Sequence, residues 1–249
     1  MNCDLGIVPI VMPQTTTLSK RGGLMRKIVL LVLILVMIAT VQVGTAFASY
    51  HAAGYVNASD SFGGGYVEWA QLWYPDPGSL SGNHNNHTLW FWTDGTNGYS
   101  YPNLAFVGVG YWHGYLKGED WNGFYWERMT KDNWWDIGKV TSVAPGSNGT
   151  NHSFEVVPDY VSGYQGYYGY IDSTQVFQFQ QAWPSKKMQV GLESSRNDQA
   201  LGHTYPSYME YKSSGNWLRW SYGAIRKESN SPYSWAWRNN VYYLGDDWR

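Results

Sequence analysis

The sequence predicts an all-β protein, an antiparallel two-sheet β-sandwich, from three observations. After residue 48, glycine, asparagine, proline, aspartate or serine interrupts the chain at intervals of roughly eight to twelve residues. Between these interruptions lie short runs rich in valine, tyrosine, tryptophan and phenylalanine, which favour strands. No amphipathic helical pattern longer than two turns is present. This combination is typical of short antiparallel strands in a sandwich or barrel, and the lack of an internal repeat argues against a propeller.

The expected strands follow one another along the chain with short turns between them. Asp172 and Ser173 predict a tight hairpin turn, and residues 75–86 and 144–149 are expected to form loops. The predicted strands are 66–74, 88–94, 104–113, 123–130, 134–143, 152–158, 166–172, 174–181, 186–194, 206–213, 216–222 and 233–243.

Alternation of apolar and polar residues assigns some of these strands to faces. In 186–194 the apolar alternate positions are expected inside, so Glu193 points to the opposite surface. In 88–94, Trp90 and Trp92 share one face, while the other face is also apolar. This pattern predicts a central strand with one face in the core and the other lining a groove.

The N-terminal segment resembles an export signal. Residues 25–48 contain a basic pair, a long apolar run and an Ala-Phe-Ala sequence, in the order of a secretory signal peptide. Residues 1–24 are interpreted as an upstream start over-call, and residues 49–249 as a single sandwich domain. The apolar run is also nearly long enough for an uncleaved anchor. If the signal is cleaved, we expect the protein to contact a membrane only during export. We expect a secreted or cell-surface location.

The composition of the chain after residue 48 limits the classes of possible binding partner. The expected mature chain carries 13 basic and 18 acidic side chains, so its net charge is near −5. Nucleic-acid binding requires a basic surface, so we expect no nucleic-acid partner. The single cysteine, Cys3, lies before the expected cleavage site, which excludes an intrachain disulfide and a thiolate metal site in the mature domain.

Several short segments carry a resemblance to known families. Residues 168–176, Tyr-Gly-Tyr-Ile-Asp-Ser-Thr-Gln-Val, resemble a hairpin common in the concanavalin A-like jelly-roll superfamily. Residues 70–73 (Ala-Gln-Leu-Trp), 107–111 (Val-Gly-Val-Gly-Tyr) and 189–193 (Gln-Val-Gly-Leu-Glu) are similar to strands of the neprosin-type β-sandwich domain. The resemblance implies a concanavalin-like jelly roll, and for the neprosin type a pair of catalytic glutamates. Glu193 matches the second of these positions, but Gly108 stands at the first. This departure puts the peptidase chemistry in doubt, because one carboxylate cannot both activate water and protonate a leaving group.

Paired carboxylates elsewhere remain a candidate for hydrolysis. Glycosidases use two carboxyl groups about 5 Å or roughly 6.5–9.5 Å apart. Glu68, Glu127 and Glu193 all lie in predicted strands among aromatic residues, so Glu193 could pair with Glu127 or with Glu68. The alternative is that these glutamates are solvated or paired with arginine, for example Glu127 with Arg128.

Metal sites receive weaker support, and we expect neither a cofactor nor a catalytic metal. His84 and His87 lie close together in an expected loop and would need a third ligand such as Asp76 or His113 for zinc. Two loop pairs leave room for a structural calcium ion, but ordinary turn residues are the simpler interpretation. These pairs are Asp132 with Asn133 and Asn197 with Asp198.

All 15 tryptophans and 21 tyrosines lie after residue 48. Their number exceeds what a single core of this size requires. Some are therefore expected to be exposed or to line a groove, and exposed aromatic patches mark contacts. We expect a non-catalytic secreted protein that binds polysaccharide or another glycan through an aromatic groove. The alternatives are a secreted hydrolase that uses Glu193, and a structural cell-envelope protein. The expected ligand-binding residues are Trp90, Trp92, Trp112 and Trp126.

Overall fold

Within its described residues, a computed structural model of the protein contains fifteen strands and no helix. It describes residues 50–58, 61–70, 74–92, 105–130, 135–180, 185–199, 201, 206–221, 225–238 and 241–246. No helix among these residues is long and apolar enough to cross a membrane. The predicted signal peptide and start over-call lie outside the described residues.

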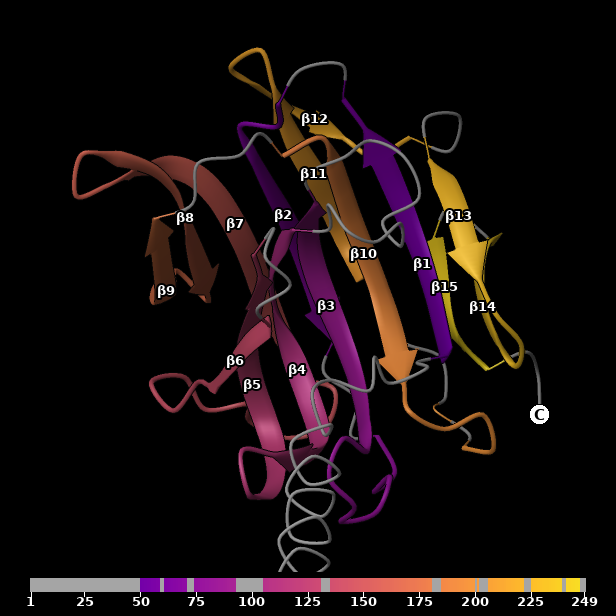
Figure 1. The fold of residues 1–249 in the computed structure, drawn as a ribbon. Helices are drawn as coiled ribbons and strands as arrows, with labels where there is room; N and C mark the ends of the chain where they lie inside the picture. Colours follow the sequence, from indigo (N-terminus) through magenta and orange to yellow (C-terminus); the bar gives the residue numbers. More distant parts are fainter. Residues whose placement is uncertain are drawn as a thin grey trace, which may run out of the picture. The chain divides into compact units, whose positions relative to one another are not determined.

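The strands form two large antiparallel sheets and one small one (Figure 1). The seven-stranded sheet has the order β13-β1-β10-β3-β4-β5-β6, the six-stranded sheet the order β12-β11-β2-β7-β8-β9, and β14 pairs with β15. The bounds are β1 Tyr50–Asn57, β2 Gly64–Ala70, β3 His84–Trp92, β4 Phe106–Leu116, β5 Glu119–Met129, β6 Trp135–Lys139, β7 Asn151–Val161, β8 Tyr164–Ile171, β9 Thr174–Gln180, β10 Lys187–Ser194, β11 Pro206–Ser213, β12 Asn216–Arg219, β13 Arg226–Ser229, β14 Tyr233–Arg238 and β15 Val241–Asp246.

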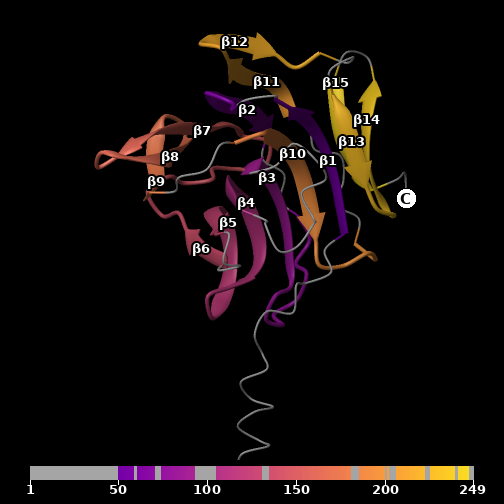
Figure 2. The ribbon, with the colours of Figure 1, turned by 45° about the horizontal axis from the view of Figure 1, so that its top comes forward.

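The predicted antiparallel two-sheet sandwich is therefore confirmed. Figure 2 shows the two large sheets as separate layers, with strands from distant parts of the sequence side by side in each. In the seven-stranded sheet, β10 lies between β1 and β3, so both of its edges are hydrogen-bonded. Most predicted strands agree with the structure to within a few residues, and the Asp172–Ser173 turn has the positive φ angles of a tight hairpin.

The core lies between the two large sheets and follows the predicted alternation. Met188, Val190 and Leu192 of β10 are completely buried in it, as are Leu89 and Phe91 of β3. Across the interior, the ring of His87 on β3 stacks on Trp69 of β2, with ring centroids 4.3 Å apart. Trp90, Gln189 and Glu193 therefore belong to the opposite face of the seven-stranded sheet.

Three predictions about the elements are wrong. Residues 84–86, expected in a loop, form the start of β3. The single strand expected at 233–243 is two paired strands, β14 and β15. The strands β1 and β13 were not predicted. Their sequences, Tyr-His-Ala-Ala-Gly-Tyr-Val-Asn and Arg-Lys-Glu-Ser, lack the bulky alternating pattern on which the prediction relied.

Candidate functional site

The candidate site is the face of the seven-stranded sheet that points away from the core, here called the A face. Its residues alternate with the core residues along β10, β3, β4 and β5. Glu127, Gly108, Trp90 and Gln189 form one row across these four strands, because each pairs with the next in register. Other members are Thr88, Trp92, Phe106, Trp112, Tyr125, Lys187 and Glu193.

The centre of the A face is a buried carboxylate held by three donors. The indole N–H groups of Trp90 and Trp135 donate to Glu127 over 2.7 Å and 2.9 Å, and the Tyr125 hydroxyl donates over 3.0 Å. Burial raises the pKa of Glu127, and the three hydrogen bonds offset part of that rise. Glu127 is thus neither solvated nor paired with Arg128, which instead bonds Asp136.

Two glycines on β4 permit this network. A Cβ atom at Gly108 would lie 2.7 Å from Cδ1 of Trp90, so only glycine lets the Trp90 indole cross β4 and reach Glu127 on β5. A Cβ atom at Gly110 would lie 2.7 Å from Oγ1 of Thr88, which crosses β4 to the Tyr125 hydroxyl. At both positions, side chains of β3 contact side chains of β5 directly, because the glycine of β4 between them has no side chain.

Three buried polar atoms on the A face have no hydrogen-bond partner among the described residues: Nε2 of His84, Nε1 of Trp112 and Oε1 of Gln189. Nδ1 of His84 lies 2.9 Å from the Gly82 carbonyl and must donate to it. Burial lowers the pKa of His84 to about 4, so at neutral pH its Nε2 is an acceptor. The face therefore presents one unused donor and two unused acceptors.

The charges at the other end of the A face are internally neutralised. The completely buried ammonium of Lys187 lies 3.1 Å from Glu228 of β13 and 4.3 Å from the centre of the Tyr55 ring. The amide N–H of Gln189 donates to the same Glu228 oxygen over 2.8 Å. A charged ligand would find no uncompensated opposite charge in this group.

The predicted carboxylates Glu127 and Glu193 share the A face but are not level across the sheet. Burial raises the pKa of Tyr125, and the charges of both carboxylates raise it further. Gln189, not Glu193, is level with Gly108 and Glu127, and Glu193 lies four residues further along β10. Three strand spacings separate the backbones of β10 and β5 by roughly 14 Å, and four residues add roughly 14 Å along the strands. Glu68 lies on the outer face of the six-stranded sheet, bonded to Tyr66, with the core between it and the A face.

The predicted aromatic set is divided. Trp90, Trp92 and Trp112 lie on the A face, whereas Trp126 lies on the core side, edge to face with Phe179 of β9 at 5.0 Å. The three A-face indoles are only 2%, 5% and 2% exposed, and His84 stacks on Trp112 at 4.5 Å. Their ring faces therefore contact the protein, so the A face offers polar atoms more than open stacking platforms.

The histidines do not form the metal site considered from the sequence. His84 and His87 lie on opposite faces of β3, because they are three residues apart in a strand. Tyr74 contacts Nδ1 of His87 at 3.1 Å in the core. No group of three metal-ligating side chains occurs in the part of the chain that the structure describes. Asp198 is paired with Arg196, while Asp132 and Asn133 lie outside that part.

Sequence reasoning did not assign roles to Tyr125 or Gln189, and it considered His84 only as a zinc ligand. One signal was available for Tyr125: a Tyr-x-Glu sequence occurs three times, at 66–68, 125–127 and 208–210. In each, the tyrosine hydroxyl donates to the glutamate two residues later, because side chains at i and i+2 share a face of a strand. Gln189 and His84 carry no comparable pattern.

Comparison with known proteins supports the fold. No protein-family model matches this chain, and no curated protein matches its sequence. Among solved structures, a scytalido-glutamic peptidase with a transition state analog inhibitor superimposes with a TM-score of 0.52 at 11% identity, covering 80% of this chain and 98% of that one. At this identity the likeness shows the sandwich fold alone.

Two further solved structures are less similar. SCP-B, a member of the Eqolisin family of peptidases, has a TM-score of 0.48 at 11% identity, over 80% of this chain and 98% of its own. A Bacillus licheniformis beta-glucanase has a TM-score of 0.34 at 10% identity, over 75% of this chain and 64% of its own. Likeness at these scores carries no argument here. The similarity to neprosin-type domains stays a prediction from the sequence.

Proposed function

We propose that this is an exported, non-catalytic protein whose A face binds a segment of a neutral polysaccharide. One observation carries the proposal: Nε2 of His84, Nε1 of Trp112 and Oε1 of Gln189 are buried on one face without partners among the described residues. An unsatisfied buried polar atom costs about 1–3 kcal/mol, so a ligand that displaces the protein atoms covering these three and bonds to all of them gains affinity from each. Hydroxyl groups can serve both the donor and the acceptors.

The spacing of these atoms supports a chain rather than a single small molecule. Gln189 is level with Trp90, six residues along β3 from His84, which corresponds to about 20 Å. One ligand must therefore extend along the strands to reach both ends of the A face. The compensated charges of Lys187, Glu228 and Glu127 favour a neutral ligand, since none of them needs a counter-ion.

Affinity electrophoresis over a panel of neutral and acidic polysaccharides tests this function. Gln189→Met and His84→Phe keep the approximate volume of each side chain. Each removes the unused acceptor and also one donor within the protein, to Glu228 and to the Gly82 carbonyl respectively, so retardation is compared at equal folded fraction. We expect each to weaken retardation about five- to tenfold in the apparent Kd, as the loss of one hydrogen bond predicts. The matched control is Gln178→Met, because Gln178 is exposed on β9 of the other sheet. Failure of every glycan to retard the protein would contradict the proposal.

A second function, hydrolysis, is favoured by the surroundings of Glu193. In register with Glu193 on the same face lie His51 of β1 and Asn86 of β3. A carboxylate beside an imidazole and an amide can activate water and stabilise an oxyanion. If the protein is a hydrolase, Glu193→Gln abolishes its activity on glycan or peptide substrates while glycan retardation persists. Equal activity in wild type and this variant would reject a catalytic Glu193.

A further inference from the structure

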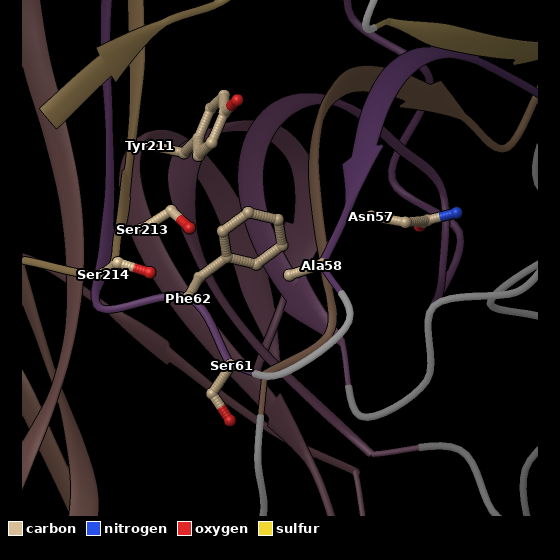
Figure 3. Close-up of a pocket in the computed structure, with 7 residues that line it drawn as sticks. All are labelled: Asn57, Ala58, Ser61, Phe62, Tyr211, Ser213 and Ser214. Atoms are coloured by element: carbon tan, nitrogen blue, oxygen red, sulfur yellow. The ribbon is translucent and has the colours of Figure 1, made fainter. Parts of the chain in front are cut away.

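The outer face of the six-stranded sheet, here called the B face, contains two Tyr-x-Glu pairs side by side. Tyr66 and Glu68 lie on β2, and Tyr208 and Glu210 lie on β11, the neighbouring strand (Figure 1). Tyr211, the residue after Glu210, has the opposite orientation and lines a cavity near the turn between β11 and β12 (Figure 3). The B face is therefore separate from that cavity, and the core lies between it and the A face.

The antiparallel register relates the two Tyr-x-Glu pairs by an approximate two-fold axis. Tyr208 is paired with Glu68, and Glu210 is paired with Tyr66. In each pair the tyrosine hydroxyl donates to the glutamate of its own strand, over 2.9 Å on β2 and 2.8 Å on β11. The two rings meet edge to face, with their centroids 6.1 Å apart. The B face therefore presents the same unit, one aromatic ring with one carboxylate, twice.

One of the two units already holds a cation. The guanidinium carbon of Arg219, on the edge strand β12, lies 4.0 Å from the centre of the Tyr208 ring. Arg219 is also paired in register with Glu210, the glutamate that accepts the hydrogen bond from Tyr208. A planar guanidinium can stack on an aromatic ring and face a carboxylate at the same time. The Tyr-x-Glu unit is therefore suited to an arginine side chain.

The unit on β2 has a serine where the other unit has its arginine. The approximate two-fold axis places β7 on the far side of β2, as β12 lies on the far side of β11. The residue of β7 paired with Glu68 is Ser153, which corresponds to Arg219 in the pair with Glu210. No cationic group of a described residue lies over the Tyr66 ring, and Tyr66 and Glu68 are both partly exposed. An arginine from another molecule could therefore take the corresponding place.

The charges around Tyr66 favour a basic ligand. Tyr66 is paired with Glu210 on one side and with Glu155 of β7 on the other, so carboxylates flank it in addition to Glu68. Burial raises the pKa of Glu155, and the charge of Lys212 offsets part of that rise. Glu68, by contrast, forms no ion pair with any residue that the structure describes. A cation that reaches Tyr66 therefore meets a carboxylate without a cationic partner.

We propose that the B face binds a basic segment of a partner protein, with one arginine side chain stacked on Tyr66 and facing Glu68. A segment is required because a single arginine stacked at an exposed site binds weakly. Further rings lie on both sides of Tyr66 across the sheet. Tyr170 of β8 is paired with Glu155, and Trp217 of β12, which is 40% exposed, would contact a Cβ atom at Gly64. The proposal does not depend on the function of the A face.

NMR titration with blocked alanine pentapeptides tests the proposal, with arginine, citrulline or lysine at the central position of the peptide. We expect the arginine peptide to shift the ring signals of Tyr66. The citrulline peptide has nearly the same shape without the charge, and the lysine peptide has the charge without the planar group, so both should bind at least fivefold more weakly. Absence of a Tyr66 shift with the arginine peptide, or equal binding of the citrulline peptide, would overturn the proposal. Equal binding of the lysine peptide would overturn the assignment to arginine.

Substitutions at the two corresponding places should have opposite effects. Ser153→Arg supplies a cation from β7, so the arginine peptide should bind at least fivefold more weakly. Arg219→Ser removes the cation from Tyr208, so the ring signals of Tyr208 should then shift with the peptide as those of Tyr66 do. Gln178→Arg is the matched control for net charge, because it adds the same charge on β9, three strands from β2.

The outcomes of these variants decide between a specific site and general attraction. Weaker binding in Ser153→Arg alone, with a new response of Tyr208 in Arg219→Ser, supports the site on Tyr66. Unchanged binding in Ser153→Arg, an equal loss in Gln178→Arg, or an unresponsive Tyr208 in Arg219→Ser would each contradict it. Glycan retardation should be the same in all three variants, because the substitutions lie on the opposite side of the core from the A face.

Discussion

The indole N–H of Trp90 on β3 donates a hydrogen bond of 2.7 Å to the carboxylate of Glu127 on β5, although β4 lies between the two strands. The contact exists because Gly108 of β4 has no side chain at that point. Thr88 and Tyr125 repeat the arrangement over Gly110. These two contacts connect alternate strands and fix the positions of the side chains at the centre of the A face.

The first prediction concerns Gly108. In Gly108→Ala, the added methyl group would lie 2.7 Å from Trp90 and 3.0 Å from Thr88, so one of them must move. We expect the free energy of unfolding in urea to fall by about 1–3 kcal/mol, as for other overpacked sites. Gly63→Ala is the control, because its nearest contact would be 3.4 Å from the flexible chain of Lys212. Equal effects of the two substitutions would contradict the argument.

The second prediction compares two Tyr-x-Glu sequences. Glu127→Gln places an amide N–H₂ among three donors that all require an acceptor, so at least one buried donor loses its partner. We expect a loss of stability of about 1–3 kcal/mol. Glu68→Gln makes the same change on the half-buried face of β2, where water can replace a lost partner. Chemical denaturation should show a smaller loss of stability for Glu68→Gln than for Glu127→Gln. A larger loss for Glu68→Gln would contradict the prediction.

The third prediction is the titration of Tyr66. Burial, together with donation to Glu68, raises the pKa of Tyr66 to about 12. Glu68→Gln removes the negative charge, so we expect the pKa of Tyr66 to move down toward 10, measured by NMR on tyrosine labelled at the ring carbon. Glu210→Gln serves as the control, because Glu210 accepts from Tyr208 instead. It should lower the pKa of Tyr208, and a similar shift of Tyr66 in both variants would refute the assignment.

The fourth prediction is a loss of stability in acid. Burial lowers the pKa of His84 to about 4 and that of His87 to about 3, whereas both have a pKa near 6.5 in the unfolded chain. Below pH 6.5 the unfolded state binds protons that the folded state excludes. Each histidine therefore reduces the free energy of unfolding by roughly 1.4 kcal/mol per pH unit, until the pH approaches its folded pKa. The stability is fully present above pH 6.5.

His87→Phe keeps an aromatic ring in the core and removes one of these protonation sites. The slope of the unfolding free energy against pH between 6 and 4.5 should then decrease by the contribution of about one bound proton. This holds whatever the stability of the variant at pH 7. An unchanged slope would show that His87 is not neutral and buried in the folded protein.

The fifth prediction separates the two faces of the sheet. Trp126 lies on the core side, packed against Phe179, whereas Trp112 lies on the A face with its N–H unused among the described residues. Trp112→Phe should weaken glycan retardation, and Trp126→Phe should leave it unchanged after correction for any change in folded fraction. Loss of retardation in Trp126→Phe alone would contradict the face assignment.

Much of the fold could be predicted from the sequence because alternation is a local property. The buried positions of β10 and the two-faced character of β3 follow from residues two apart. The strand β1 was not predicted because its small residues are required by contacts with distant parts of the chain. A Cβ atom at Gly54, for example, would collide with the ring of Trp235 on β14. The strand β13 has the charged composition of a sheet edge.

The candidate site was less accessible to sequence reasoning, because it depends on which strands are neighbours. Glu127 and Glu193 both point to the A face, but only the strand order shows that three spacings separate them. The meaning of Gly108 likewise depends on register. From sequence alone it marked a missing carboxylate, whereas in the structure its empty space is filled by Trp90.

That filled space fixes the order in which this surface can evolve. A glutamate cannot be introduced at position 108 by one substitution, because the Trp90 indole already occupies the volume that its side chain requires. Trp90 must first be exchanged for a smaller residue, which strips Glu127 of one of its donors. Each single step leads through a less stable protein, so a loss of stability, and not one mutation alone, separates the present arrangement from a two-carboxylate surface.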